Sequence, residues 1–383
     1  MPRGLFLLTI KAAVVPAAGK PFQYETLQLA GPRPDEVCVQ IKGVGICHTD
    51  LVVSGGGIPY AFPAVLGHEG SGVVRAVGSN IQKVAVGDHV LLSFRSCGDC
   101  DRCEKHQPAY CRSSAQLNYT GRRTDGTSPL RDQQQVEVSA NFFGQSSFAS
   151  HVITYERNLV RVDPSLPIEI LGPLGCGIQT GAGSILRSLC VEPGSSLLIV
   201  GGGAVGLSAV MGGVIAGCDH IVLVEPVAAR RALAREFGAD DVIDPSANPD
   251  WAKTLRRAHP LGFDFALDTS GRAKAQESAL RCLATMGVLG LVGLGDIETK
   301  PPGKANLLVT NGQTIRGILE GDSDPETFLP ELLEHYQHGR LPVDRMVTKF
   351  PLASINEAVA AVHDGSCVKA VLIPDEEVAD DGE

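Results

Sequence analysis

Four cysteines lie close together in one polar loop, at spacings that suit a metal ion. Cys97, Cys100, Cys103 and Cys111 form the pattern C-x2-C-x2-C-x7-C. Four thiolates can surround a zinc ion tetrahedrally, and short spacings allow one loop to supply all of them. An iron–sulfur cluster is the alternative, but bacterial ferredoxin spacing places the fourth cysteine sooner and before a proline, whereas here Arg112 follows it. Residues 97–111 therefore predict a closed, structural zinc site with no position open to a substrate.

A second possible ligand set is spread along the chain: Cys47 in GICHTD, His68 in GHEGSG and Cys176 in GPLGCGIQTG. Each residue alone has an ordinary explanation, because a single cysteine in a β region is usually buried filler and a histidine beside a glutamate is often a surface pair. Together they offer two thiolates and one imidazole, a set that holds catalytic zinc and leaves the fourth coordination position free. They predict a second zinc ion that can act on a substrate.

A glycine-rich turn follows an apolar strand and opens a helix, with the spacing G-x-G-x-x-G: Gly201, Gly203 and Gly206. In this context the pattern predicts a dinucleotide site, in which the backbone, including that of Val205, approaches the pyrophosphate at a helix N-terminus. Glu225 ends the next strand, 19 positions beyond Gly206, where its carboxylate would accept hydrogen bonds from the adenosine ribose. That carboxylate would repel a 2′-phosphate, so we predict NAD, although Arg230 and Arg231 lie one helical turn further on.

The elements that position these residues change in character along the chain. Up to about Leu92 the sequence reads as short strands ended by glycine and proline, such as 37–47 and 71–78, which indicates a barrel-like β region. From about Ser195 to Glu320, continuous apolar strands alternate with helices, which predicts a parallel sheet covered on both faces. Between them, 117–139 is polar and aperiodic, and we expect a functional or mobile loop there.

The bulk composition narrows the class of protein. A chain of 383 residues favours two domains, and its net charge of −10 argues against nucleic acid or an anionic membrane as the main partner. The N-terminal run suits a first strand better than a signal peptide, and no apolar run is long enough to span a membrane, so we expect a cytoplasmic protein. Five cysteines lie outside the two ligand sets, and we interpret them as buried small hydrophobes: Cys38, Cys190, Cys218, Cys282 and Cys367.

With these motifs in order along nearly the whole chain, the sequence resembles the zinc-containing medium-chain dehydrogenase/reductase family. The stretch GHEGSGVVRAVGSNIQKVAVGDHV at 67–90 carries the likeness together with the four-cysteine loop and the glycine-rich turn. The segments LGPLGCGIQTG, FFGQSSFA and EGDSDP are most similar to the bacterial aryl-alcohol (benzyl-alcohol) dehydrogenases. The resemblance implies an α/β fold class, with a GroES-like β-barrel-type catalytic domain at 1–178 and 322–383 and a Rossmann doubly wound parallel sheet at 179–321.

The resemblance also implies roles around the second zinc. Thr49 matches the hydroxyl that takes the substrate proton, Asp50 would hold His68 by its other ring nitrogen, and Glu69 matches an acid beside the metal that is a candidate alternate ligand. Liver enzymes of the family end their proton relay with a histidine where this chain has Val52. The proton would then leave through Thr49, ribose and solvent, or through His48, which is otherwise a solvent-facing loop histidine.

Further positions match the family's cofactor and substrate contacts. Lys369 matches a basic contact to the pyrophosphate, and three residues match contacts to the nicotinamide: Thr180, Val292 and Leu294. Three apolar residues match the substrate cleft and favour an aromatic or allylic alcohol: Phe94, Leu117 and Phe142. The expected enzyme is an alcohol dehydrogenase with NAD and two zinc ions per chain, which passes a hydride between a primary alcohol and NAD and gives the aldehyde.

Two other functions fit the same motifs. A thiol-adduct (glutathione- or mycothiol-dependent) formaldehyde dehydrogenase would need an anion pocket, for which Arg95, Arg122 and Arg123 are available. A non-catalytic NAD-binding sensor is the more remote reading, because a sensor has no need of an open metal position. Members of the family extend the Rossmann sheet across a two-fold axis, so we expect a homodimer or homotetramer with 309–319 as the candidate edge.

Overall fold

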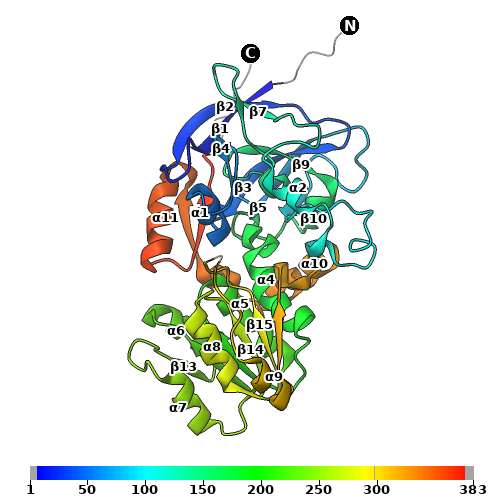
Figure 1. Ribbon diagram of the computed structural model, residues 1–383. Coiled ribbons are helices and arrows are strands. Elements are labelled where there is room, and N and C mark those ends of the chain that lie inside the picture. The colour runs from blue at the N-terminus through cyan, green and yellow to red at the C-terminus, as the bar shows by residue number, and fades with distance from the viewer. Residues whose placement is uncertain (1–6, 297, 376–383) are drawn as a thin grey trace. The chain divides into compact units, whose positions relative to one another are not determined.

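The computed structural model describes residues 7–296 and 298–375, which divide into two compact units (Figure 1). The first, here the barrel unit, holds the residues up to Cys176, 324–333 and those from Val343 onward. The second, here the sheet unit, holds Gly177–Ser323 and Glu334–Pro342. Among the described residues, no helix has the length and apolar character needed to cross a membrane.

Two mostly antiparallel sheets build the barrel unit. The first has the order β4 (Ala64–Val65), β1 (Leu7–Val15), β2 (Gln23–Ala30), β7 (Leu130–Arg131), β8 (Glu137–Val138). The second has the order β10 (Leu159–Val162), β6 (His89–Leu92), β5 (Gly70–Val77), β3 (Glu36–Gly45), β18 (Lys369–Ile373), β17 (Val347–Pro351), and β9 (His151–Tyr155) also pairs with β3. Because β18 pairs with β3, the two ends of the chain share one sheet. The unit's helices are α1 (His48–Ser54), α2 (Ser114–Tyr119), α3 (Ile168–Leu171) and α11 (Ile355–Asp364), and the residues of α10 (Pro325–Gln337) are divided between the two units.

Close packing of backbone explains why β3 contains glycine. Val37, Val39 and Ile41 alternate along this strand and are buried in the core of the barrel unit, as their period of two predicts. At Gly43 an added Cβ would lie 1.9 Å from the carbonyl oxygen of Glu169, because the backbone of α3 crosses directly over the strand. A side chain at that position would therefore push α3, and Cys176 after it, away from β3.

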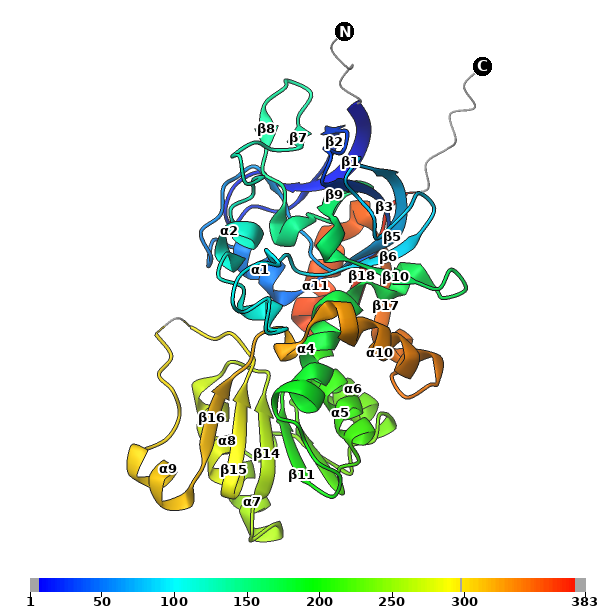
Figure 2. The ribbon, with the colours of Figure 1, turned by 90° about the vertical axis from the view of Figure 1, so that its right-hand side faces the viewer.

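The sheet unit has the expected Rossmann architecture. Its six parallel strands run in the order β13 (Asp241–Ile243), β12 (His220–Val224), β11 (Ser196–Val200), β14 (Phe263–Asp268), β15 (Leu283–Leu291), β16 (Thr314–Gly317). This is the strand order of the doubly wound dinucleotide-binding fold, and β16, β15, β14 and β11 lie side by side in Figure 2. The helices are α4 (Gly177–Gly183), α5 (Ala204–Ala216), α6 (Ala228–Glu236), α7 (Trp251–Ala258), α8 (Ala273–Cys282) and α9 (Ala305–Asn311).

The stretch 117–139, which we expected to be a functional or mobile loop, contains short elements: α2 ends in it, β7 and β8 pair within it, and β7 joins β2 of the first sheet. Ion pairs of its arginines, which leave no hydrophobic pattern in the sequence, hold it in place. Cys190 is exposed at the end of a helix and Cys218 is only half-buried, so they are not core hydrophobes, whereas Cys38, Cys282 and Cys367 are buried.

Candidate active site

Three side chains from distant parts of the chain meet in the barrel unit. Cys47 directly precedes α1, His68 lies between β4 and β5, and Cys176 follows the turn after α3. One Sγ or ring-nitrogen atom from each lies within 4.8 Å of the others. A single divalent ion can contact all three atoms at ordinary zinc–sulfur and zinc–nitrogen distances after small side-chain rotations. The structure therefore brings together the dispersed set that the sequence singled out.

Asp50 fixes the orientation of His68. Its Oδ1 lies 2.9 Å from His68 Nδ1 and accepts a hydrogen bond from the Gly67 N–H at 3.0 Å, while its Oδ2 accepts one from the Cys47 N–H at 2.9 Å. Asp50 is fully buried, so these partners replace the water that its charge has lost. With Nδ1 directed at the carboxylate, Nε2 faces the two sulfurs, and this atom is buried without a hydrogen-bond partner. A metal ion would satisfy it.

The charges of the group suit a cation. A hydrogen bond from Cys176 holds the pKa of Cys47 well below its usual value. Burial works to raise this pKa, and the neighbouring His68 works to lower it further. Burial works to lower the pKa of His68, but the charges of Asp50 and Cys47 outweigh it and hold that pKa well above the ordinary value. A dication bound between the two side chains would favour the thiolate of Cys47 and the neutral imidazole of His68, the forms that coordinate metal.

The other predicted residues around this group fall into two sets. Thr49 Oγ1 lies 3.9 Å from the Cys47 sulfur, while His48 is exposed and Val52 is partly buried on the same helix α1. Lys369 Nζ lies 2.6 Å from Glu69 Oε2 and donates a further hydrogen bond to the carbonyl of Ile46.

Both members of the Lys369–Glu69 pair are buried. Burial raises the pKa of Glu69, and the ammonium of Lys369 works against that rise. Lys369, whose ammonium was predicted to contact a pyrophosphate, is thus bonded to Glu69, and both residues belong to the barrel unit.

The four-cysteine loop forms a second group in the barrel unit. Its sulfurs lie within 4.8 Å of one another, and Cys111 and Cys97 are 3.4 Å apart. Backbone N–H groups point at sulfur: Cys97 N–H donates to Cys111 Sγ at 3.3 Å, and Arg112 N–H donates to Cys100 Sγ at 3.4 Å. The bond from Arg112 contributes most to lowering the pKa of Cys100 to about 6. Four sulfurs without a carboxylate among them suit a tetrahedral zinc ion.

The glycine-rich turn of the sheet unit has the geometry of a phosphate cradle. Gly201 has φ +101°, and an added Cβ at Gly206 would lie 1.8 Å from the Gly201 carbonyl oxygen, so neither position accepts a side chain. At Gly203 an added Cβ would meet nothing within 4 Å, and this open space lies at the N-terminus of α5. Val205, in the first turn of α5, directs its carbonyl at Gly181 of α4. The turn leaves room for a pyrophosphate beside Gly203.

Glu225 is held rigidly at the carboxyl end of β12. Its Oε2 accepts a hydrogen bond from the Gly202 N–H at 2.6 Å and its Oε1 one from the Val227 N–H at 2.8 Å. Arg231 donates to the carbonyl oxygens of Glu225 and Pro226 and pairs with Asp244 at 3.1 Å. This guanidinium is therefore directed at the segments that follow β12 and β13, and the carboxylate of Glu225 lies beside the glycine-rich turn.

The residues assigned to the nicotinamide lie in the sheet unit. Thr180 in α4 donates a hydrogen bond to Glu320 Oε2 at 3.3 Å. Val292 follows β15 and donates its N–H to the Asp268 carbonyl at 2.9 Å, and Leu294, two residues later, has 65% of its surface exposed. An exposed leucine after a parallel strand is available to a ligand, whereas Thr180 is buried.

Aromatic rings pack against His68. Phe143 stacks on the imidazole with ring centroids 4.3 Å apart, and Phe142 meets it edge-on at 5.3 Å. Tyr119 contacts both phenylalanines. Phe142 was expected from the sequence, and Phe143 was not, although the doubled FF of FFGQSSFA is a visible signal. Phe143 adopts φ +52°, an unusual conformation for a phenylalanine, and this turn directs its ring at His68.

The other two predicted pocket residues are also buried. Phe94 belongs to the same apolar core as Phe142 and Phe143, and Leu117 packs with Cys103 and Cys111 beside the four-cysteine group. Gln145 is a further residue that sequence reasoning missed: its Nε2 donates to the carbonyl oxygens of His68 and Ser93 and so fixes the backbone of a proposed ligand.

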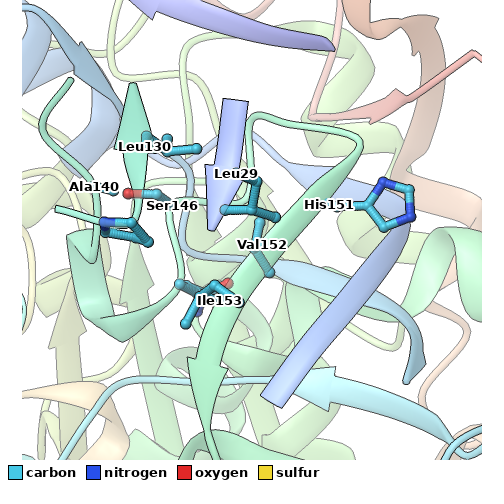
Figure 3. A pocket seen from close by; sticks show the side chains of 9 residues that line it. Leu29, Leu130, Ala140, Ser146, His151, Val152 and Ile153 are labelled. Carbon is cyan, nitrogen blue, oxygen red and sulfur yellow. The ribbon is translucent and has the colours of Figure 1, made fainter. Parts of the chain in front are cut away.

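A small pocket lies inside the barrel unit (Figure 3). Its lining is mostly apolar and comes from β2, β7, β9 and the segment before β9: Leu29, Pro129, Leu130, Ala140, Gln145, Ser146, His151, Val152 and Ile153. Cys47, His68 and Cys176 do not line it. The pocket is therefore separate from the three-ligand group, although Gln145 lines the pocket and also donates to the His68 carbonyl.

Comparisons with known proteins agree over nearly the whole chain. Residues 33–164 match the alcohol dehydrogenase GroES-like domain, and residues 204–335 match the zinc-binding dehydrogenase family. Geraniol dehydrogenase of Castellaniella defragrans is 44% identical over 367 residues, which cover 96% of this chain and 98% of that protein. The crystal structure of benzyl alcohol dehydrogenase from Acinetobacter calcoaceticus superposes with a TM-score of 0.92 at 38% identity, over 96% of this chain and 100% of that one. A probable S-(hydroxymethyl)glutathione dehydrogenase of Schizosaccharomyces pombe is 33% identical over 95% of this chain and 97% of that protein.

Proposed function

Because the chain belongs to the zinc-dependent medium-chain alcohol dehydrogenase family, we propose that it oxidises a primary aromatic or allylic alcohol to the aldehyde with NAD. The observation that carries the proposal is the group of Cys47, His68 and Cys176, in which the Nε2 atom of His68 is buried beside two sulfurs and has no hydrogen-bond partner. The barrel unit is the proposed catalytic domain, and the sheet unit is the proposed NAD-binding domain.

The residues of the barrel unit fit a catalytic zinc ion. Cys47, His68 and Cys176 would hold it, and Asp50 keeps the imidazole in the tautomer that offers Nε2. Zinc bound there supplies Lewis acidity toward the substrate oxygen, and NAD supplies the hydride acceptor. Cys97, Cys100, Cys103 and Cys111 would hold a second, structural zinc ion.

Thr49 and His48 are the proposed proton carriers. The hydroxyl of Thr49 lies near the Cys47 sulfur and can accept a hydrogen bond from a substrate hydroxyl in the same region. His48 is exposed on the first turn of α1 and is the nearest group in sequence that exchanges protons with solvent near neutral pH. With Val52 on the helix in place of a histidine, His48 is the proposed end of the relay.

The surroundings of His68 favour a flat, unsaturated alcohol. Phe142, Phe143 and Tyr119 gather against this imidazole, and aromatic faces attract planar substituents more than polar ones. Two relatives that are named for geraniol and for benzyl alcohol act on an allylic and an aromatic primary alcohol, which supports the same substrate class.

The thiol-adduct alternative lacks a free anion site among its candidate arginines. Arg123 makes a buried ion pair with Glu36, with N–O distances of 2.6 and 2.8 Å. Arg122 pairs with Glu137. The guanidinium carbon of Arg95 lies 3.3 Å from the ring centroid of Tyr155. Since each guanidinium already has a partner, a glutathione carboxylate would have to displace one of them, and we favour the simple alcohol.

The choice of NAD over NADP rests on charge. The Glu225 carboxylate is fixed at the end of β12, and Arg231, the basic residue best suited to a 2′-phosphate, is bonded to Asp244 and to carbonyl oxygens. A 2′-phosphate would meet a fixed negative charge without a free guanidinium from Arg231 to offset it.

We further propose a homodimer formed through the edge of the Rossmann sheet. β16 is the last strand of that sheet, and within the described residues it has a neighbour on one side only. Beside it α9 buries none of its residues and exposes Leu307 and Val309, the latter to 81%. Light scattering would test the dimer, and the double change L307D/V309D is expected to give monomers. A monomeric wild-type chain would contradict the proposal.

A substrate panel tests the proposed function. Initial rates with benzyl alcohol, geraniol, ethanol and S-(hydroxymethyl)glutathione would be measured with NAD and with NADP. We expect kcat/KM for benzyl alcohol and geraniol to exceed that for ethanol by about a hundredfold, since burial of the larger apolar group contributes about 2–3 kcal/mol. His68→Ala is expected to remove one zinc ion and the activity together. A preference for the glutathione adduct, or activity that survives loss of that zinc, would contradict the proposal.

A further inference from the structure

A third group of metal-binding side chains lies at the amino edge of the sheet unit. His220 is the first residue of β12, Asp241 is the first residue of β13, and His259 directly follows α7, four residues before β14 begins at Phe263. Because the strands are parallel, their first residues meet at one edge, and the glycine-rich turn lies at the opposite, carboxyl edge. The group is therefore separate from the proposed cofactor site and from both cysteine groups.

The three side chains are close enough to share one ion. His220 Nε2 lies 3.2 Å from Asp241 Oδ2, and the rings of His220 and His259 have centroids 4.7 Å apart at an angle of 35°. One nitrogen or oxygen atom from each of the three residues lies within 4.8 Å of the others. Within the described parts of the chain, only the two cysteine groups meet the same criterion. Two imidazoles and one carboxylate are a common ligand set for zinc, cobalt, nickel and copper dications.

The rings are held in place before any ion arrives. Both imidazoles pack on Phe263, the buried first residue of β14, with centroids 6.2 Å away for His220 and 5.0 Å for His259. His220 and His259 are only partly buried and Asp241 is exposed, so an ion can reach the group from solvent. A site whose ligands are already oriented loses less side-chain freedom when it binds an ion.

The charge of this edge also favours a cation. Asp240 and Asp264 lie beside the group, and their carboxylates accept hydrogen bonds from the Ile221 N–H and from Ser196. These two carboxylates already accept hydrogen bonds from backbone N–H groups and from a hydroxyl. They add negative charge to this edge without being needed as metal ligands. The two imidazoles would repel each other if both were protonated, and an ion bound through the nitrogens of their neutral forms avoids that repulsion.

We propose that His220, Asp241 and His259 bind one divalent transition-metal ion, zinc in the first instance, on the surface of the sheet unit. The ion would join the starts of β12 and β13 to the segment before β14, and its remaining coordination positions would face solvent. It would be a third metal ion per chain, bound independently of the proposed catalytic activity.

Calorimetric titration of the fully zinc-loaded enzyme with zinc chloride, together with metal counting by mass spectrometry, tests this proposal. We expect one additional zinc ion per chain, and we expect His259→Gln to weaken its binding at least tenfold. Asp241→Asn should weaken it similarly, and because this carboxylate is exposed, that variant remains informative if a histidine variant misfolds. His338→Gln removes an exposed imidazole of the same unit that bonds only to a backbone carbonyl, and it should bind zinc like the wild type.

Circular dichroism and thermal unfolding of each variant would verify its fold, and zinc is expected to raise the melting temperature of the wild type and of His338→Gln but not of His259→Gln. No third equivalent of zinc in the wild type would overturn the proposal. It would be overturned equally if a third ion bound but neither His259→Gln nor Asp241→Asn weakened it, because the ion would then lie elsewhere. Neither result bears on the substrate panel, so the two proposals fail separately.

Discussion

Replacement of Asp50 by asparagine tests whether this buried carboxylate controls zinc at the three-ligand group. In the wild type, Asp50 accepts three hydrogen bonds, from His68, from the Gly67 N–H and from the Cys47 N–H. Asparagine keeps one oxygen, which can still serve His68 and Gly67. Its NH2 group would then face the Cys47 N–H, so that two donors oppose each other in a fully buried position.

The magnitude follows from those contacts. An unsatisfied buried donor costs about 1–3 kcal/mol, and loss of the charge that orients a metal-binding histidine typically weakens metal affinity about 10- to 100-fold, or about 1.4–2.7 kcal/mol. We therefore expect zinc at Cys47, His68 and Cys176 to bind about 10- to 100-fold more weakly in Asp50→Asn. Zinc at the four-cysteine group should keep its wild-type affinity, because none of its sulfurs contacts Asp50.

The assay is competition with a chromophoric zinc chelator, followed by kcat and KM at saturating zinc. The matched control is Asp101→Asn, which changes an exposed carboxylate that Arg112 binds at 2.9 Å beside the four-cysteine group and which should alter neither zinc affinity by more than about twofold. If Asp50→Asn kept both zinc ions at wild-type affinity, the assigned role of Asp50 would be wrong. Equal weakening of both sites would point instead to a general loss of structure.

Three further predictions concern the ion pair, the protons and the loop. Arg123→Met should lower the free energy of unfolding, measured by urea titration, by about 3–5 kcal/mol, because it leaves the buried Glu36 without its ion-pair partner. The KM for benzyl alcohol should stay unchanged. A changed KM at normal stability would mean that the arginine has a binding role. The pKa of His68 is held above its usual value in the metal-free group, so zinc competes with a proton for this imidazole. Zinc affinity should therefore fall as the pH is lowered from 8 to 6, and calorimetry in buffers of different ionisation enthalpy would detect the released proton. A pH-independent affinity would contradict the assignment. Cys103→Ser should lose one zinc ion and make residues 97–111 at least tenfold more sensitive to proteolysis while the other zinc remains, and loss of both ions would refute the independence of the two sites.

The sequence predicted well those features in which the chemistry is local. The four cysteines of the loop lie within 15 residues of one another, and the glycine-rich turn joins a strand directly to a helix, so the chain between the ligands is short in both cases. Cys47 and Cys176 are far apart in sequence and no local pattern connects them. Their association came from the combined ligand chemistry and from the family resemblance, and in the structure α3 and β3 bring them together.

Contacts between distant strands were the features that the sequence did not reveal. Lys369 was assigned to a pyrophosphate as a basic residue of the last strand. It lies in β18, which pairs with β3, and this pairing brings its ammonium to Glu69, 300 residues away. Arg123 likewise looked available for an anion, although Glu36 holds it in the core. In both cases the tertiary fold brings a partner to a charge, and the sequence alone shows no sign of that partner.

This pairing of charges explains how the barrel unit can bury so many ionisable groups around one site. Lys369 and Glu69 cancel each other, and Asp50 is satisfied by two backbone N–H groups and an imidazole. With zinc bound, Cys47 and Cys176 would both be thiolates and His68 would be neutral, so the two positive charges of the ion would compensate the two sulfurs. A dication would therefore leave the three-ligand group without net charge in a region where the neighbouring ionisable groups already have partners.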